Sequence, residues 1–246
     1  MEKEIHIYYH VCLINDGLFI ALEQMHLLAI SGLMYNAKSI NIGIKYKSKD
    51  ELETFKRIVY YHNISGNINI LYEEDNDLNN SRELSTAIHL KNYADYLKDS
   101  DSYILYFHTK GVSHTHTTLE NPTRFWRYYM EYFMINKWKD CVSVLDNGFE
   151  SCGTYAYDIS IMNNHLSITN KNNNMKYYPG TFYWINTSLI KKIPIEYFHN
   201  NTEYIIYSME ALPALIEHQQ YIFSSPNPHS MNLYHKVLHP LQYNHL

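Results

Sequence analysis

Residues 102–111 read SYILYFHTKG, an aromatic and β-branched run that ends in a polar turn. A short apolar run of this kind is typical of a buried β-strand, and we expect a strand over residues 102–107. The next four residues, 108–111, then follow the end of that strand directly. In an α/β sheet, ligands bind just beyond the carboxyl ends of the strands, so this turn is a candidate for a binding site.

Three similar strand patterns precede this one, and each is followed by a helical pattern. The strands are expected over residues 5–13, 39–44 and 67–72, and the helices over residues 16–34, 49–62 and 81–97. Strands that alternate with helices predict a parallel sheet with helices on both faces. This arrangement would bring four polar side chains near one crevice: His10, Lys45, Glu73 and His108.

The second half of the chain is less regular. We expect an aromatic helix over residues 122–145, extended segments over 149–157 and 177–186, a helix over 202–218 interrupted at Pro213, and a strand over 221–224. No internal repeat and no linker composition separates the two halves. One domain over residues 1–246 is therefore the simplest organisation.

Composition narrows the classes of function. The chain has 246 residues and a net charge of −5, with no run of five lysines or arginines, which argues against a nucleic-acid partner. Three cysteines form no CxxC pair and indicate reduced thiols. The charged N-terminus does not resemble a signal peptide, and no apolar run approaches the roughly 20 residues of a membrane span. These features predict a cytoplasmic protein with no transmembrane segment.

The turn itself carries residues that suit phosphate chemistry. Lys110 could bind a diphosphate as a point charge, and His108 could act as a hydrogen-bond donor. Gly111 would let the backbone approach a phosphate closely. Taken alone, four residues of this kind are more often a solvated turn, so the prediction depends on the rest of the chain.

Three motifs occur in a characteristic order: Tyr103 to Gly111, then Trp126-Arg127 within a helix, then Gly180 to Trp184. With them, the chain resembles a family of GT-A-like nucleotide-sugar glycosyltransferases, and the resemblance spans most of its length. It implies a single GT-A-type, Rossmann-like α/β domain with a mostly parallel central sheet flanked by helices. Residues of about 1–111 would form the nucleotide-sugar-binding half, and about 112–246 the acceptor-binding and catalytic half.

The resemblance implies transfer of a sugar, with inversion, from a nucleoside-diphosphate donor to a glycan or another hydroxyl acceptor. One departure concerns the metal, because GT-A enzymes commonly hold Mg²⁺ or Mn²⁺ with an Asp-x-Asp where this chain has His108-Thr109-Lys110. Hard divalent cations prefer carboxylate oxygens, which this turn lacks. We therefore assign no metal ligand. We expect either metal-independent transfer, with Lys110 neutralising the leaving group, or a Mn²⁺ or Mg²⁺ held by other groups.

The resemblance also implies roles for individual residues. Glu210 on a late helix is the expected general base, with Glu203 as its competitor, and His108 and Lys110 complete the expected catalytic set. The expected donor-binding residues are His10, Arg82, Glu83, Thr86, His108, Thr109, Lys110 and Arg127. The expected acceptor-binding residues are Gly180, Tyr183 and Trp184.

Several of these roles have structural alternatives. Arg127 could form an ion pair with Glu131, one helical turn away, instead of contacting a phosphate. Tyr183 and Trp184 could be core residues, and Glu210 a surface carboxylate. For the whole chain, the alternative is a nucleotide- or glycan-binding protein that retains the fold without turnover. A Rossmann oxidoreductase is disfavoured, because residues 12–17 read CLINDG and contain no GxGxxG.

Overall fold

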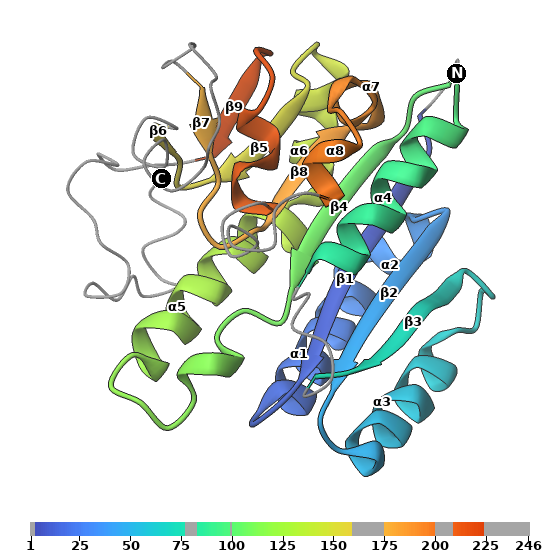
Figure 1. Cartoon of the computed structure of the whole chain (residues 1–246), viewed down its shortest axis with the longest axis vertical. Helices are drawn as coiled ribbons and strands as arrows, with labels where there is room; N and C mark the ends of the chain where they lie inside the picture. The colour runs from blue at the N-terminus through green and yellow to red at the C-terminus, as the bar shows by residue number, and fades with distance from the viewer. Residues whose placement is uncertain (1–2, 77–82, 99, 159–174, 200–208, 224–246) are drawn as a thin grey trace.

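The computed structural model describes residues 3–76, 83–98, 100–158, 175–199 and 209–223 (Figure 1). A seven-stranded sheet runs through it in the order β3-β2-β1-β4-β8-β5-β9. The strands of this sheet are β1 (Ile5–Leu13), β2 (Ser39–Tyr46), β3 (Ile68–Asp75), β4 (Tyr103–His108), β5 (Ser151–Thr154), β8 (Tyr183–Asn186) and β9 (Gln220–Phe223). A second, two-stranded sheet pairs β6 (Tyr157–Asp158) with β7 (Lys176–Tyr177).

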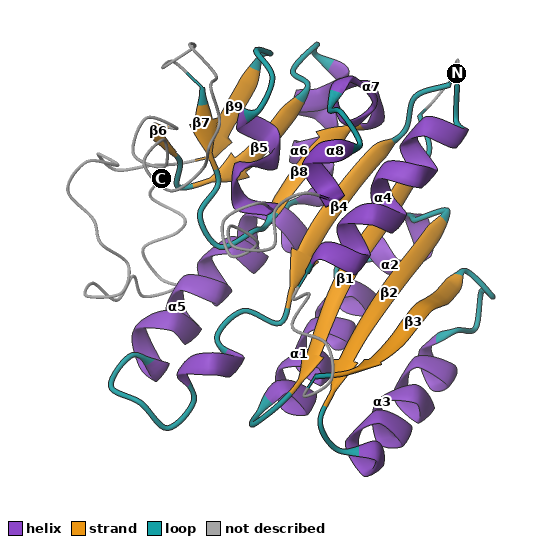
Figure 2. Cartoon of the chain, viewed as in Figure 1, coloured by secondary structure: helices purple, strands orange, loops and turns teal. Residues whose placement is uncertain are grey.

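Helices cover both faces of the large sheet (Figure 2). They are α1 (Gly17–Ile30), α2 (Leu33–Asn36), α3 (Lys49–His62), α4 (Leu84–Tyr96), α5 (Glu120–Glu131), α6 (Trp138–Asp146), α7 (Thr187–Lys192) and α8 (Glu196–His199), with short turns η1 (Val112–His114), η2 (Tyr132–Asn136) and η4 (Leu212–Ala214). The predicted α/β class with a mostly parallel central sheet is confirmed. In the large sheet, only β8 runs antiparallel to its neighbours among the strands that are described.

Alternation along the strands divides the core into two layers. Tyr9 of β1 and Phe107 of β4 pack on the face covered by α1, α3, α5 and α6. Tyr8 and Tyr106, the preceding residues on the same strands, pack on the face covered by α4, α7 and α8. Since successive strand side chains point to opposite faces, each central strand needs apolar residues at nearly every position. The continuous apolar runs in the sequence follow from this requirement.

Two predicted helices are divided in the structure. The helix expected over residues 16–34 stops at Ile30, because Gly32 has a φ of +78° and takes the chain out of the helical region. The helix expected over 122–145 is interrupted by the π-helical turn η2 between α5 and α6. The main-chain carbonyl of Met134 in this turn accepts a hydrogen bond from Trp184 Nε1 at 2.9 Å. A side chain from another part of the sheet therefore supplies a hydrogen bond to the backbone of this irregular turn.

The strand order reverses between β1 and β4. β1 leads through α1 to β2 on one side, whereas β3 leads through α4 to β4 on the other side of β1. Ligands in open α/β sheets bind outside the carboxyl ends of the strands at such a switch point. His10 of β1 and His108 of β4 are register partners there.

No helix among the described residues is both long enough and apolar enough to cross a membrane.

Candidate functional site

A buried polar network lies on the α4 side of the switch point. His10 Nδ1 hydrogen-bonds to Thr86 Oγ1 at 3.0 Å and to Tyr72 OH at 3.1 Å. Gly43, opposite His10 on β2, leaves room for this network, since a Cβ there would lie 2.4 Å from Thr86 Oγ1. Burial lowers the pKa of His10 to about 3, so its ring is neutral. Because His10 and Thr86 are both buried, the structure does not support direct contact between either side chain and a nucleotide.

Lys45 also lies in this layer, where the carboxylate beside it is Glu74 and not Glu73. Lys45 Nζ is 2.6 Å from Glu74 Oε2, and Ser85 Oγ donates to the other oxygen of the same carboxylate. Glu73 instead pairs with Lys56 at 3.0 Å. The expectation that Glu73 faces the crevice is therefore wrong. The β2–β3 register sets Glu74 beside Lys45, and the preceding strand residue points to the other face.

His108 links α4 to the second half of the chain. Its Nε2 lies 3.0 Å from the carbonyl of Gly180, which can only accept, so Nε2 carries the proton. Its Nδ1 lies 3.1 Å from Glu83 Oε1, and Tyr106 OH donates to the other Glu83 oxygen at 3.2 Å. Burial first, and then the Lys110 charge, hold the pKa of His108 well below its ordinary value. His108 therefore lies between the Gly180 carbonyl, to which Nε2 donates, and the Glu83 carboxylate, to which the neutral Nδ1 cannot donate.

Gly180 connects this link to Glu210. Pro179-Gly180 forms a turn closed by a hydrogen bond from the Thr181 amide to the Tyr178 carbonyl, and Gly180 has a φ of +96°. These are the features of a type II turn. The Gly180 amide then donates to Glu210 Oε1 at 2.7 Å. One residue thus ties the end of β4 to a carboxylate about a hundred residues further along the chain.

Glu210 is half-buried beside the turn. Burial raises the pKa of its carboxyl group, while the Lys110 charge and the Gly180 amide lower it in part. A carboxylate with a raised pKa near a fixed cation is a suitable proton acceptor. Two of the predicted catalytic residues, Glu210 and Lys110, are thus electrostatically coupled although they come from distant parts of the sequence.

Lys110 is held in place from several sides. Its Nζ lies 4.2 Å from the centroid of the Trp126 ring, a cation–π distance. Its carbonyl accepts a hydrogen bond from Arg127 Nη1 at 3.2 Å. Thr109, buried next to it, accepts from the Cys12 amide at 2.9 Å and so fastens β4 to β1. Thr109 thus fixes the turn, and its expected role as a donor contact stays a prediction.

Arg127 forms the ion pair that was the structural alternative. Its Nη2 lies 2.8 Å from Glu23 Oε2, and its Nε lies 3.3 Å from Glu131 Oε1. The side chain of Arg127 is 4% exposed. This geometry favours a structural role over pairing with a donor phosphate, because the guanidinium is buried and already faces two carboxylates.

Gln24 completes this support and was not predicted from the sequence. Its Nε2 lies 3.1 Å from the carbonyl of His108 and 2.8 Å from Glu131 Oε1. Gln24 and Arg127 therefore hold the carbonyls of His108 and Lys110, at the two ends of the HTK segment. No local pattern marks Gln24, since it lies on α1, more than eighty residues before the turn that it supports.

Tyr183 and Trp184 are core residues. Both are fully buried on β8, between β4 and β5, where helices cover both faces of the sheet. A sugar cannot stack on rings that solvent does not reach. This burial corrects the expectation that the two rings bind an acceptor. Gly180 remains at the site, where its carbonyl and its amide link His108 to Glu210.

Two of the predicted residues, Arg82 and Glu203, lie outside the described residues. Among the residues that are described, no group of three or more His, Cys, Asp and Glu side chains could hold a metal ion. No protein-family model matches this chain, and no similar sequence is found among curated proteins. The HTKG turn and its partners are therefore the features from which a function can be inferred.

The buried carboxyl of Glu131 predicts a pH-dependent stability. Burial raises its pKa from 4.5 to about 7, partly opposed by Arg127 and by the Gln24 hydrogen bond, while the Glu23 charge adds to the rise. At a pH between these two pKa values, the Glu131 carboxyl group is protonated in the folded chain and ionised in the unfolded chain. Stability should therefore fall as pH rises through this window, by up to about 1.4 kcal/mol per pH unit, and level off above it.

Urea unfolding of the wild type and of Glu131→Gln between about pH 5 and pH 8 measures this effect. The difference in unfolding free energy between the wild type and Glu131→Gln should change across this pH range. Glu53→Gln, on the exposed side of α3, is the matched control and should keep the wild-type slope. Parallel curves for the wild type and Glu131→Gln would contradict the assignment.

Proposed function

We propose that this chain is a GT-A-type glycosyltransferase that moves a sugar, with inversion, from a nucleoside-diphosphate donor to a hydroxyl acceptor. The observation that carries the proposal is the grouping of Lys110 and Glu210 around Gly180. The Lys110 ammonium lies over the Trp126 ring, a Cβ on Gly180 would lie 3.3 Å from that ring, and the Gly180 amide donates to Glu210. Lys110 is a cation fixed over an aromatic ring, and Glu210 is a carboxylate with a raised pKa. Sugar transfer needs both kinds of group, on opposite sides of the reacting carbon.

The leaving group sets the first requirement. As the bond between the anomeric carbon and the diphosphate oxygen breaks, its electron pair moves to the diphosphate, and negative charge develops there. A preorganised cation such as Lys110 stabilises that charge without reorganising. The backbone of Gly111, with a φ of +103°, gives the turn a shape that lets a phosphate approach.

The acceptor sets the second requirement. Glu210 takes the proton from the acceptor hydroxyl while the hydroxyl oxygen forms its bond to the anomeric carbon. The raised pKa makes Glu210 a stronger base than a solvated carboxylate. The hydrogen bond from the Gly180 amide orients one carboxylate oxygen, which leaves the other to face the acceptor.

A divalent cation does not fit the described residues of the turn. Glu83 is the carboxylate beside His108; one of its oxygens accepts from Tyr106 OH, and the other lies 3.1 Å from His108 Nδ1. Lys110 places a positive charge at the same edge, which repels a second cation. The proposed mechanism therefore has no step that uses a metal. Metal-independent transfer remains a prediction, and so does the cytoplasmic location.

A donor screen tests the proposal. Purified protein is incubated with a panel of nucleoside-diphosphate sugars and a mixture of hydroxyl acceptors, with Mn²⁺ or with EDTA, and released nucleoside diphosphate is measured. We expect release from one donor that survives EDTA and falls about 10²- to 10³-fold in Lys110→Met, which keeps the apolar stem over Trp126. Release only with Mn²⁺ would contradict the assignment of Lys110. Binding of a donor without release would favour the non-catalytic alternative.

A further inference from the structure

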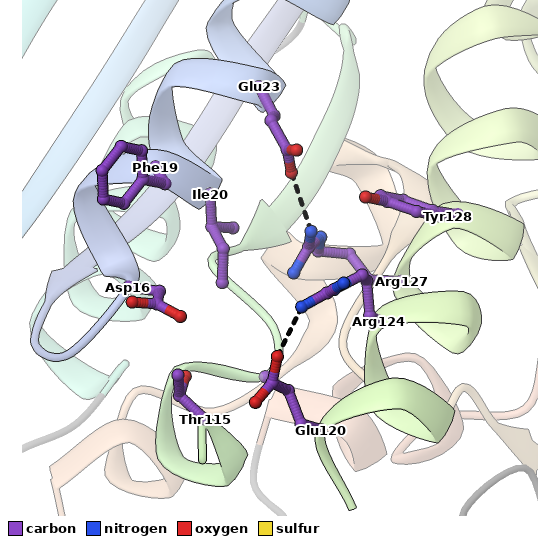
Figure 3. A pocket seen from close by; sticks show the side chains of 10 residues that line it. Asp16, Phe19, Ile20, Glu23, Thr115, Glu120, Arg124, Arg127 and Tyr128 are labelled. Atoms are coloured by element: carbon purple, nitrogen blue, oxygen red, sulfur yellow. Dashed lines mark hydrogen bonds and ion pairs between the residues drawn. The ribbon is translucent and has the colours of Figure 1, made fainter.

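A separate cleft lies between α1 and α5 (Figure 3). These helices cover the face of the sheet opposite to α4 and the His10 network. Its volume is about 410 Å³, which falls within the range of small-ligand sites. The lining residues come from the start of α1, the segment after β4 and α5, namely Asp16, Phe19, Ile20, Glu23, Gly111, Thr115, Glu120, Arg124, Arg127 and Tyr128. Gly111 and Arg127 are shared with the support of the turn, so the cleft directly adjoins the proposed active site.

The charges in the cleft indicate what kind of ligand fits. Each arginine that lines it is paired with a carboxylate, Arg127 with Glu23 and Arg124 with Glu120 (Figure 3). Asp16 adds a further carboxylate to the lining. The lining holds two guanidinium groups and three carboxylates, and four of these five groups are paired with one another, so the cleft has little net charge to attract either an anion such as a diphosphate or a cation. The lining therefore suits a neutral polar molecule.

The same ion pairs offer hydrogen bonds of both kinds. A guanidinium supplies donors and its carboxylate partner supplies acceptors, side by side. The side chains of Glu23 and Arg124 are 54% and 43% exposed, so ligand atoms can reach them. A hydroxyl group both donates and accepts, and adjacent hydroxyls on a sugar ring match such a mixed array.

Two aromatic side chains complete the cleft. Phe19 is 67% exposed on the first turn of α1, and Tyr128 lies on the α5 side (Figure 3). A single exposed aromatic ring is common on protein surfaces and means little alone. Here the ring borders a polar cleft next to a proposed sugar-transfer site, and the apolar C–H face of a sugar can pack against it.

We propose that the α1–α5 cleft binds a neutral saccharide, the non-reacting part of the glycan acceptor. The choice of a saccharide over other neutral polar ligands rests on the proposed function. Binding in this cleft would hold an acceptor chain next to the HTKG turn, whose Gly111 lines the cleft, and would use remote contacts to orient the reacting hydroxyl.

Ligand-observed NMR on the full chain tests this inference, with methyl glucoside, methyl galactoside, maltose, cellobiose and lactose as probes and uridine diphosphate as a separate probe. We expect saturable binding of at least one neutral sugar, weakened tenfold or more in Phe19→Ala and in Arg124→Gln. Tyr60→Ala, an exposed aromatic position on α3, should bind as the wild type does. Uridine diphosphate binding should be the same in Phe19→Ala as in the wild type.

The two proposals can fail separately in this experiment. No saturable binding of any sugar, or sugar binding unchanged in both cleft variants, would overturn the inference. Sugar binding that depends on Phe19, together with a donor screen in which no nucleotide sugar is bound or used, would overturn the proposed function and keep the cleft assignment.

Discussion

Glu210→Gln is expected to lower sugar transfer by about 10²- to 10⁴-fold while leaving the fold intact. In the wild type the Gly180 amide donates to Glu210 Oε1 at 2.7 Å, and a glutamine side-chain oxygen can still accept this hydrogen bond. The glutamine side chain cannot, however, take a proton from an acceptor hydroxyl. Because the substitution preserves shape, the loss should appear in kcat and not in donor affinity. Steady-state rates at saturating donor, with donor binding measured separately, check this expectation.

The control for this variant is an exposed carboxylate on the same half of the chain. Glu217→Gln removes the charge of that carboxylate and leaves Glu210 and its hydrogen bond to the Gly180 amide in place. It should retain wild-type rates. If Glu210→Gln kept more than a tenth of the wild-type rate, Glu210 could not be the general base. Glu203, the competitor noted from the sequence, would then be the next residue to change.

Trp184→Ala is expected to destabilise the fold by about 3–5 kcal/mol. The ring is fully buried at the centre of the sheet, where its removal leaves a cavity that the neighbouring strands cannot close. The substitution also removes the donor to the Met134 carbonyl in the π-helical turn, and an unsatisfied buried carbonyl adds to the cost. Urea unfolding followed by far-UV circular dichroism measures the change.

Trp184→Phe helps to separate the two contributions, because it removes the Nε1 donor but leaves a much smaller cavity than the alanine variant. It should cost less than the alanine variant. Tyr60→Ala, at an 86% exposed position, should change stability by no more than about 0.5 kcal/mol. A loss below about 1 kcal/mol in Trp184→Ala would contradict the core assignment and reopen a binding role for the ring.

The alternation of strands and helices was predictable because it follows from local patterns. The predicted strand over residues 5–13 and the predicted helix over 49–62 coincide with β1 and α3. Apolar runs, a Ser48 cap and an amphipathic stripe are properties of neighbouring residues, so a single sequence contains them. The position of the HTKG turn at the end of a central strand followed from the same patterns.

The partners of that turn could not be predicted in this way. Gln24 and Arg127 hold its two carbonyls, and Gly180 joins His108 to Glu210, all across long separations in the sequence. The register between β2 and β3 places Glu74, and not Glu73, beside Lys45. A shift of the register by one residue would put Glu73 on that face instead. Nothing local distinguishes the two glutamates.

The sequence by itself determined the class of fold, the parallel half of the sheet and the edge of the sheet at which the candidate site lies, because hydrophobic periodicity and strand order are properties of neighbouring residues. Only the tertiary structure decided which polar side chains serve the site and which hold the core. It buried Tyr183 and Trp184, paired Arg127 with Glu23 and Glu131, and joined Glu210 to the Gly180 amide. The physical reason is that burial and charge pairing depend on which segments meet in space, and those contacts join residues that are far apart along the chain.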